Sequence, residues 1–205
     1  MIYKYPQFPH VQVLGVLATN VKNIDTIKQA VISLDQRYDY CFINAANVVS
    51  VEQINCAIFK TLTNYYFNEK KPLRTNSVHA ETILNLSPNA NITDSLNRFG
   101  ISKGSANLII LKVYGLGGPQ QRQQENESLL PDDAAKDLQG VIQRDLQNIK
   151  DVVEAEVAEL DNDEQLVGIS DLKLIKKNYK LGDMMVEDRE VLSRLLVSVL
   201  QLSDL

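Results

Sequence analysis

Runs of apolar residues and their spacing divide the chain into predicted strands and helices. Nearly continuous apolar runs predict strands at residues 11–21, 40–43 and 106–114, and the last is apolar enough for a central strand covered on both faces. Apolar positions spaced by three and four residues predict helices instead. These helices span about residues 24–34, 50–67, 77–86, 91–99, 131–148, 169–181 and 188–202. The order predicts one domain over residues 1–205, of the α/β (α+β) class, with a small, mostly antiparallel central sheet and helices packed around it.

Helix boundaries are marked by residues that satisfy free backbone groups. Ser50 followed by Gln53 is a capping-box pattern, in which the Ser hydroxyl accepts from the amide three residues on and the Gln reaches back. Asn91 is a second predicted N-cap. Gly100 suits the left-handed position just after a helix, and Ile101 then supplies the apolar contact that often follows it.

Composition is that of a globular protein, with an uneven distribution of acids. The 205 residues are 44% hydrophobic and 23% charged, with a net charge of −5, so the surface is not basic overall. Residues 151–164 hold seven acids and no Lys or Arg, and we expect them to be solvated and partly disordered. Residues 115–133, rich in Gly, Pro and Gln, predict a mobile loop. No apolar run reaches the length of a signal peptide or a membrane span, so we expect no membrane contact.

Candidate catalytic groups are few. His79 and Glu81 lie two apart on a predicted helix and point about 200° away from each other, so they cannot share one metal or proton. Cys41 and Cys56 sit in apolar surroundings and are interpreted as buried thiols. No Cys or His spacing suits a metal, and "YGLGG" lacks the third glycine of a dinucleotide loop. We therefore predict no catalytic residue, no metal and no cofactor.

Two features favour binding instead of catalysis. Basic residues form local clusters that the acid-rich segment would hide from the net charge, and such clusters bind phosphates where they converge. The clusters are Lys60, Lys70, Lys71 and Arg74, then Arg98 and Lys103, then Lys176, Lys177 and Lys180. The last helix spreads its apolar residues over an arc of about 180°, wider than a lone surface helix needs. One side of it should pack on the domain and the other on a partner, although deep burial in its own domain remains the alternative.

Four stretches, taken in order, resemble a known family. They are "SVEQINCAIFKTL", "LSPNANITDSLNRFGIS", "NLIILKV" and "LIKKNYKLGD" with "LSRLLVSVLQL". Together they are similar to the TPRKB-type subunit of the KEOPS (EKC) complex, in its fungal version. The similarity covers about Tyr5 to Tyr114 and Ser170 to Leu202 and departs in a longer insert at about residues 115–169.

The resemblance implies a non-catalytic subunit. It implies binding to a small atypical kinase/ATPase of the PRPK type, with the other KEOPS subunits reached through that kinase. It also implies recruitment of tRNA by its 3′ CCA end, for threonylcarbamoyladenosine (t6A) modification, in the nucleus and cytoplasm, with links to telomere maintenance and transcription.

These expectations can be placed on residues. For tRNA we expect the corner of Ser87, Asn89 and Asn91, with Lys60 and Arg98 as neighbours for phosphates. For the kinase we expect the apolar side chains of the last two helices, which are Ile175, Tyr179, Leu192, Leu196, Val199 and Leu200. Two alternatives stay open: a small cytosolic hydrolase that uses Cys41 or His79, and a scaffold that makes no RNA contact.

Overall fold

A five-stranded antiparallel sheet forms the centre of the computed structural model, which describes residues 1–68, 71–102, 104–117, 132–182 and 188–203. The strands are β1 (Ile2–Tyr5), β2 (Phe8–Thr19), β3 (Cys41–Asn44), β4 (Leu108–Tyr114) and β5 (Glu156–Glu159). Their order is β1-β2-β4-β3, and β5 pairs with β2 beyond the end of β1. This arrangement confirms the predicted α/β class with a small, mostly antiparallel sheet.

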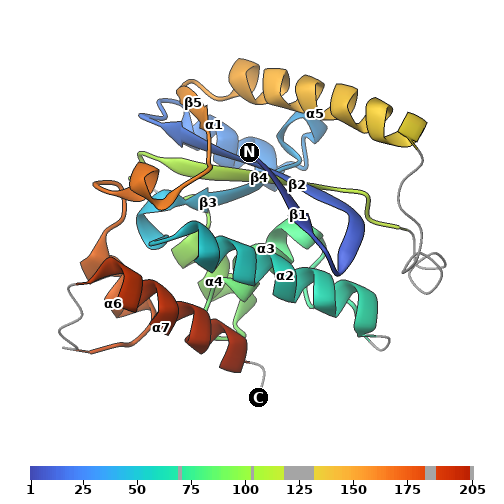
Figure 1. The fold of residues 1–205 in the computed structure, drawn as a ribbon. Helices are drawn as coiled ribbons and strands as arrows, with labels where there is room; N and C mark the ends of the chain where they lie inside the picture. Colours follow the sequence, from blue (N-terminus) through green and yellow to red (C-terminus); the bar gives the residue numbers. More distant parts are fainter. Residues whose placement is uncertain (69–70, 103, 118–131, 183–187, 204–205) are drawn as a thin grey trace.

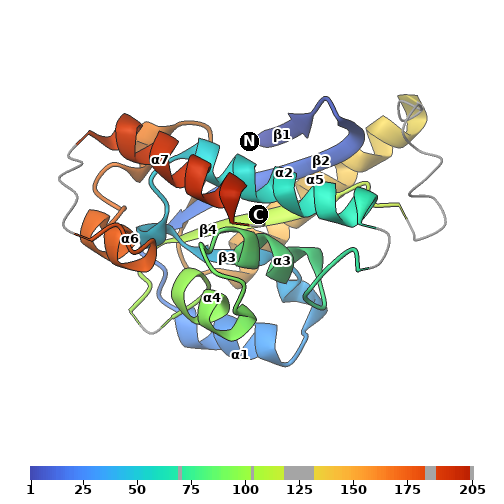
Figure 2. The same ribbon diagram turned by 90° about the horizontal axis from the view of Figure 1, so that it is seen from below.

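Helices cover both faces of the sheet (Figure 1). One face carries α1 (Ile24–Ile32) and α5 (Asp132–Val152). The other carries α2 (Val51–Phe67), α3 (Val78–Asn85), α4 (Ile92–Phe99), α6 (Leu172–Asn178) and α7 (Arg189–Leu202). Short 3-10 turns complete the chain at η1 (Gln36–Tyr38), η2 (Ala45–Asn47) and η4 (Asp163–Leu166). From below, α7 lies along α2 (Figure 2).

Strand β4 is the central strand that its apolar run predicts. It lies between β2 and β3, and Ile110 pairs with Val16 on one side and with Phe42 on the other. Ile109 and Leu111 belong to the core under α2, whereas Leu108 and Ile110 belong to the core under α1 and α5. Alternate residues of one strand therefore serve two separate cores, which explains its continuous apolar character.

Both predicted N-caps are present, but the Gln53 side chain bonds a different backbone amide from the one predicted. Ser50 Oγ accepts from the Gln53 amide at 3.1 Å and also bonds Ser193 Oγ of α7 at 2.5 Å. Gln53 does not return to the Ser50 amide; its Oε1 accepts from Val49 N–H instead, at 2.9 Å. Asn91 caps α4 as predicted, accepting from Asp94 N–H at 2.9 Å. The cap of α2 thus also joins α2 to α7.

The prediction that Gly100 is left-handed is wrong. Its φ is −80°, in the range that any residue adopts, and its N–H bonds Leu96 O at 3.0 Å. Glycine is needed there for space, because a Cβ would lie 2.5 Å from Leu96 O. Ile101 does pack at the edge of the core under α1 and α5, as expected.

Residues 151–164 are more regular than their acid content predicts. Strand β5 pairs with β2 from Val16↔Glu159 to Thr19↔Glu156, and η4 follows it with a full capping box at Asn162 and Gln165. Most of the predicted mobile loop at 115–133 lies outside the described residues. The expected disorder at 151–164 is therefore replaced by an edge strand.

Candidate functional site

The corner between α3 and α4 gathers most of the residues predicted to bind tRNA. Asn89 Nδ2 donates to Asp94 Oδ2 at 2.8 Å, and Arg98 Nε donates to Asp94 Oδ1 at 2.7 Å. Asn89 Oδ1 accepts from the Asn91 amide, and Ser87 Oγ accepts from the Asn89 amide. The hydrogen bond from Asn89, followed by that from Arg98, lowers the pKa of Asp94. Many of the polar groups of these side chains therefore already hydrogen-bond within the corner and hold its shape.

Lys60 does not belong to this corner. Its Nζ donates to Leu200 O at 2.8 Å and to Ser203 Oγ at 2.6 Å. A lysine at the last carbonyls of a helix stabilises the negative end of its dipole. Lys60 therefore ties α2 to the C-terminal end of α7, and the prediction that grouped it with Asn89 is wrong.

A groove of lysines lies beside the α3–α4 corner. Lys173, Lys176, Lys177 and Lys180, with Gly182, line a cavity of about 580 Å³. The charge of Lys180 contributes to the lowered pKa of Asp94, which makes the groove and the corner neighbours. We call this cavity the lysine groove. Three of its lysines were recognised in the sequence; Lys173 was missed, although the spacing 173, 176, 177, 180 marks one face of a helix.

The predicted kinase-binding residues lie largely inside the protein. Leu192, Leu196 and Leu200 of α7 and Ile175 of α6 are fully buried in the core under α2, and Tyr179 is 4% exposed. The Tyr179 hydroxyl accepts from Gln53 and donates to Leu86 O at 2.5 Å. Of the six residues only Val199 is half-buried. Five of them cannot touch a partner in this structure, because the domain uses them to close its own core.

The wide apolar arc of α7 is nevertheless two-sided. Beside its inward stripe, the helix carries a second stripe of apolar residues spaced by three and four, in which the end residues are more than half exposed. This stripe, the α7 flank, consists of Val191, Leu195, Val199 and Leu202. The inward side packs on the domain as predicted, whereas a partner on the outward side stays a prediction, and that side consists mostly of residues other than those proposed for the kinase.

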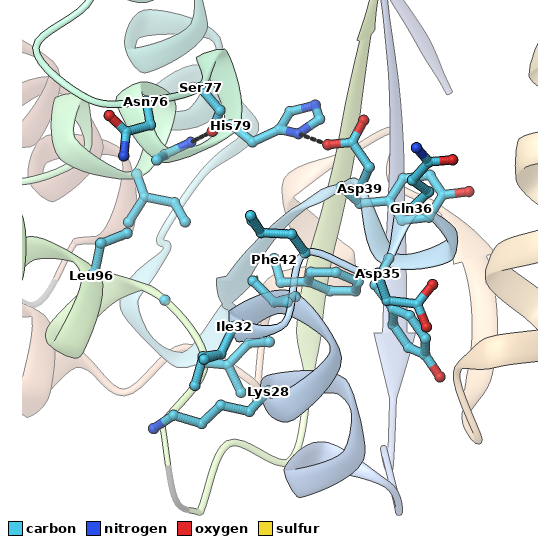
Figure 3. A pocket seen from close by; sticks show the side chains of 18 of the residues that line it. Lys28, Ile32, Asp35, Gln36, Asp39, Phe42, Asn76, Ser77, His79 and Leu96 are labelled. Carbon is cyan, nitrogen blue, oxygen red and sulfur yellow. Dashed lines mark hydrogen bonds and ion pairs between the residues drawn. The ribbon is translucent and has the colours of Figure 1, made fainter.

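A second cavity, larger than the lysine groove, was not predicted. It has a volume of about 760 Å³ and lies between α1 with η1 on one side and α3 with α4 on the other (Figure 3). We call it the α1–α3 groove. Its lining includes Lys28, Val31, Ile32, Leu34, Asp35, Tyr38, Asp39, Phe42, Asn76, His79, Ile83 and Leu96. No single sequence motif marks it, because its walls come from four separate segments.

A small charged cluster closes one end of the α1–α3 groove. His79 Nδ1 lies 3.2 Å from Asp39 Oδ1, and Lys112 Nζ lies 2.7 Å from Asp39 Oδ2 (Figure 3 shows the histidine contact). The hydrogen bond from His79, with help from Lys112, holds the pKa of Asp39 well below its usual range. His79 therefore joins α3 to the turn that precedes β3, which is a structural role.

Cys41, one of the two residues offered for a hydrolase, lies in surroundings that disfavour a nucleophile. Cys41 is 1% exposed, and burial raises the pKa of its thiol, so the reactive thiolate is disfavoured. Among the described residues no group of three His, Cys, Asp or Glu side chains is placed to hold a metal ion. Within the same residues, no helix combines the length and apolar character that crossing a bilayer requires.

Comparison with known proteins identifies the family. The family profile of the kinase binding protein CGI-121 matches residues 18–204. The chain is 32% identical over 195 residues to the "EKC/KEOPS complex subunit CGI121" of Candida albicans, covering 92% of this chain and 88% of that protein. It is 34% identical over 188 residues to the protein of the same name from Debaryomyces hansenii, covering 89% and 86%. The chain belongs to the CGI-121 family of kinase-binding proteins.

Proposed function

We propose that this protein is a non-catalytic subunit of the KEOPS/EKC complex that binds and supports its small atypical PRPK-type kinase/ATPase. The observation that carries the proposal is the family match, which covers residues 18–204 and therefore every helix of both layers together with β3, β4 and β5. Other KEOPS subunits are reached through the kinase. The burial of Cys41 agrees with a subunit that binds partners and performs no chemistry of its own.

The second part of the proposal is that the protein helps to recruit tRNA, through its 3′ CCA end, for t6A modification. The support for it is the lysine groove, where three lysines of α6 and Lys180, just beyond the end of α6, lie beside Arg98, whose side chain is 35% exposed. Phosphate contacts provide most of the affinity of such sites and impose no sequence requirement. Ser87, Asn89 and Asn91 shape the corner next to it. The proposed locations are the nucleus and the cytoplasm, and roles in telomere maintenance and transcription would follow from the complex.

Titration of tRNA with the purified chain at several salt concentrations tests this part. Each phosphate contact of a single strand contributes about 0.7 to the slope of log K against log salt. Replacing Lys176 and Lys177 by Gln should therefore lower that slope by roughly 1.4. The matched control replaces Lys22 and Lys150, which are exposed and lie away from the groove, by Gln.

Two results would contradict the tRNA assignment. Equal slopes for the groove variant and the control would remove the lysine groove from the tRNA site. Affinity that does not depend on salt in the unmodified chain would favour the scaffold that makes no RNA contact.

A further inference from the structure

The C-terminal end of α1 holds a leucine in an unfavourable place. Asp35 N–H bonds Ala30 O at 3.0 Å and Leu34 N–H bonds Val31 O at 3.2 Å, which together make a Schellman motif. The left-handed position of this motif favours Gly or Asn, yet here it is Leu34, with a φ of 58°. Its side chain is 86% exposed, so burial of the side chain within this protein does not offset the energetic cost of the strained backbone. Strain of this kind, when observed, points to a function.

Leu34 belongs to an apolar rim that surrounds the α1–α3 groove. In the described part of the chain eleven large apolar side chains are exposed, and four of them line this one cavity. The four are Val31, Ile32, Leu34 and Leu96, of which Ile32 is 64% exposed. The floor is made of buried Tyr38, Phe42 and Ile83, so the rim stands on the core of the domain. A concave apolar surface with this rim is a docking site for another protein.

The charges around the groove indicate what its occupant carries. Asp35 is held by Arg37 at 2.7 Å, and Asp39 is held by His79 and Lys112, so both acids already have basic partners. Lys28 lies partly buried at the groove wall, and its side chain has no hydrogen bond or ion pair with any described residue. An ammonium without an ion-pair partner favours a carboxylate opposite it. The groove therefore fits an apolar surface that bears an acidic side chain.

The walls of the groove are themselves helices. Figure 3 shows Lys28 and Ile32 on one wall and His79, with Leu96 of α4, on the other. Such a trough suits an amphipathic helix that inserts aliphatic side chains between two flanking helices. The α7 flank, in contrast, is a stripe on one helix, and none of its four residues lines the α1–α3 groove or the lysine groove.

We propose that the α1–α3 groove is where the kinase of the complex docks, by a helix that places aliphatic side chains against Leu34 and Ile32 and a carboxylate opposite Lys28. The inference rests on the proposed function, because it takes the kinase as the partner. It moves the kinase site from the side chains of α6 and α7 to a different part of the surface.

Leu34→Gly is the central variant, because it separates binding from folding. Glycine adopts a φ of 58° freely, so the variant should melt at or above the temperature of the unmodified chain. Its affinity for the purified kinase, measured by calorimetry with the full chain, should fall at least about tenfold. Leu34→Asn also tolerates this backbone and is the second variant at the same position. Lys28→Glu should weaken binding mainly at low salt.

Matched controls come from the α7 flank. Val191→Ser and Leu202→Ser remove apolar side chains that are 51% and 62% exposed, similar to Ile32, and they should leave the affinity for the kinase unchanged. Ile32→Ser is the matching substitution in the α1–α3 groove, and it should weaken the affinity for the kinase.

Each outcome separates the two proposals. If the unmodified chain does not bind the kinase, the proposed function fails. If it binds and the folded Leu34 variants bind equally well, the groove assignment is overturned while the proposed function stands. Loss of affinity in the α7 controls would place the kinase on α7. If the Leu34 variants no longer bind a CCA-ended oligonucleotide but still bind the kinase, the α1–α3 groove is an RNA-binding site and the kinase assignment is overturned.

Discussion

Glu81 is a carboxylate buried completely beneath the loop that leads into α3. Arg74 Nε donates to Glu81 Oε1 at 2.9 Å, while the backbone N–H groups of Arg74 and Thr75 donate to Oε2 at 2.8 and 2.9 Å. Arg74 also donates to Asn85 Oδ1 at 2.5 Å, and Asn85 donates to Thr61 of α2 at 2.8 Å. One carboxylate therefore joins a loop, α3 and α2 in a single network.

Glu81→Ala should destabilise the fold through this network. The substitution leaves two backbone donors without their acceptor and the guanidinium without its ion-pair partner. Removing one partner of a buried pair costs about 3–5 kcal/mol. Because the Arg74 side chain is 29% exposed, water can solvate it again, and we expect the lower end of that range, about 3 kcal/mol. For a chain of this size the melting temperature should then fall by roughly 6–12 °C.

Thermal unfolding followed by circular dichroism, with urea unfolding at 25 °C, measures the effect. Glu81→Gln keeps one oxygen for the two backbone donors and should lose less stability than Glu81→Ala. Glu190→Ala removes an exposed acid paired with Arg194 and should change the melting temperature little. If Glu81→Ala melted within about 2 °C of the unmodified chain, the buried network would contribute no stability, and the reasoning would be refuted.

Three further predictions concern single positions. Gly100→Ala should destabilise the chain, because its Cβ would meet Leu96 O at 2.5 Å; an unchanged urea midpoint would contradict this contact. Asp39 has a lowered pKa, so the stability it provides is present above the unfolded-state pKa of about 4 and is lost as the pH falls below it. Asp39→Asn should therefore narrow the difference between urea midpoints at pH 6 and at about pH 3, and an equal difference would argue against its ion pairs. Iodoacetamide should spare Cys41 in the native protein and react slowly with half-buried Cys56, which peptide mass mapping would show; rapid labelling of Cys41 would disprove its burial.

Local signals in the sequence predict the parts of the fold that depend on local physics. The N-caps at Ser50 and Asn91 were recognisable because a side chain within three residues satisfies them. The apolar run of β4 similarly required burial on both faces. Strand β5 was missed because it contains Glu156 and Glu159, and acidic residues of this kind suit only an edge strand. No local signal in the sequence shows that β1 leaves part of β2 open for such an edge strand.

The candidate sites were harder to predict, because they depend on which face of a helix meets the core. Periodicity identified α7 as two-sided, but it could not say that Leu192 and Leu196 face inward while Val191 faces outward. The sequence placed Lys60 in a basic cluster, yet its ammonium donates a hydrogen bond to the carbonyl of Leu200, 140 residues away in the sequence. The spacing of apolar residues placed Leu34 in the predicted helix 24–34, but α1 ends at Ile32, and the left-handed backbone of Leu34 belongs to the Schellman motif beyond it.

The late pairing of β5 has a consequence for the nascent chain. Thr19 of β2 and Glu156 of β5, which pair directly across the two strands, are 137 residues apart in the sequence. At ribosomal rates of 5–20 residues per second, that half of the β2 edge waits roughly 7–27 s for its partner. During this interval an apolar strand presents open backbone groups to other nascent chains, which is the situation that chaperones relieve. Co-translational aggregation should therefore depend on how soon β5 is synthesised, which follows the synthesis of the other four strands.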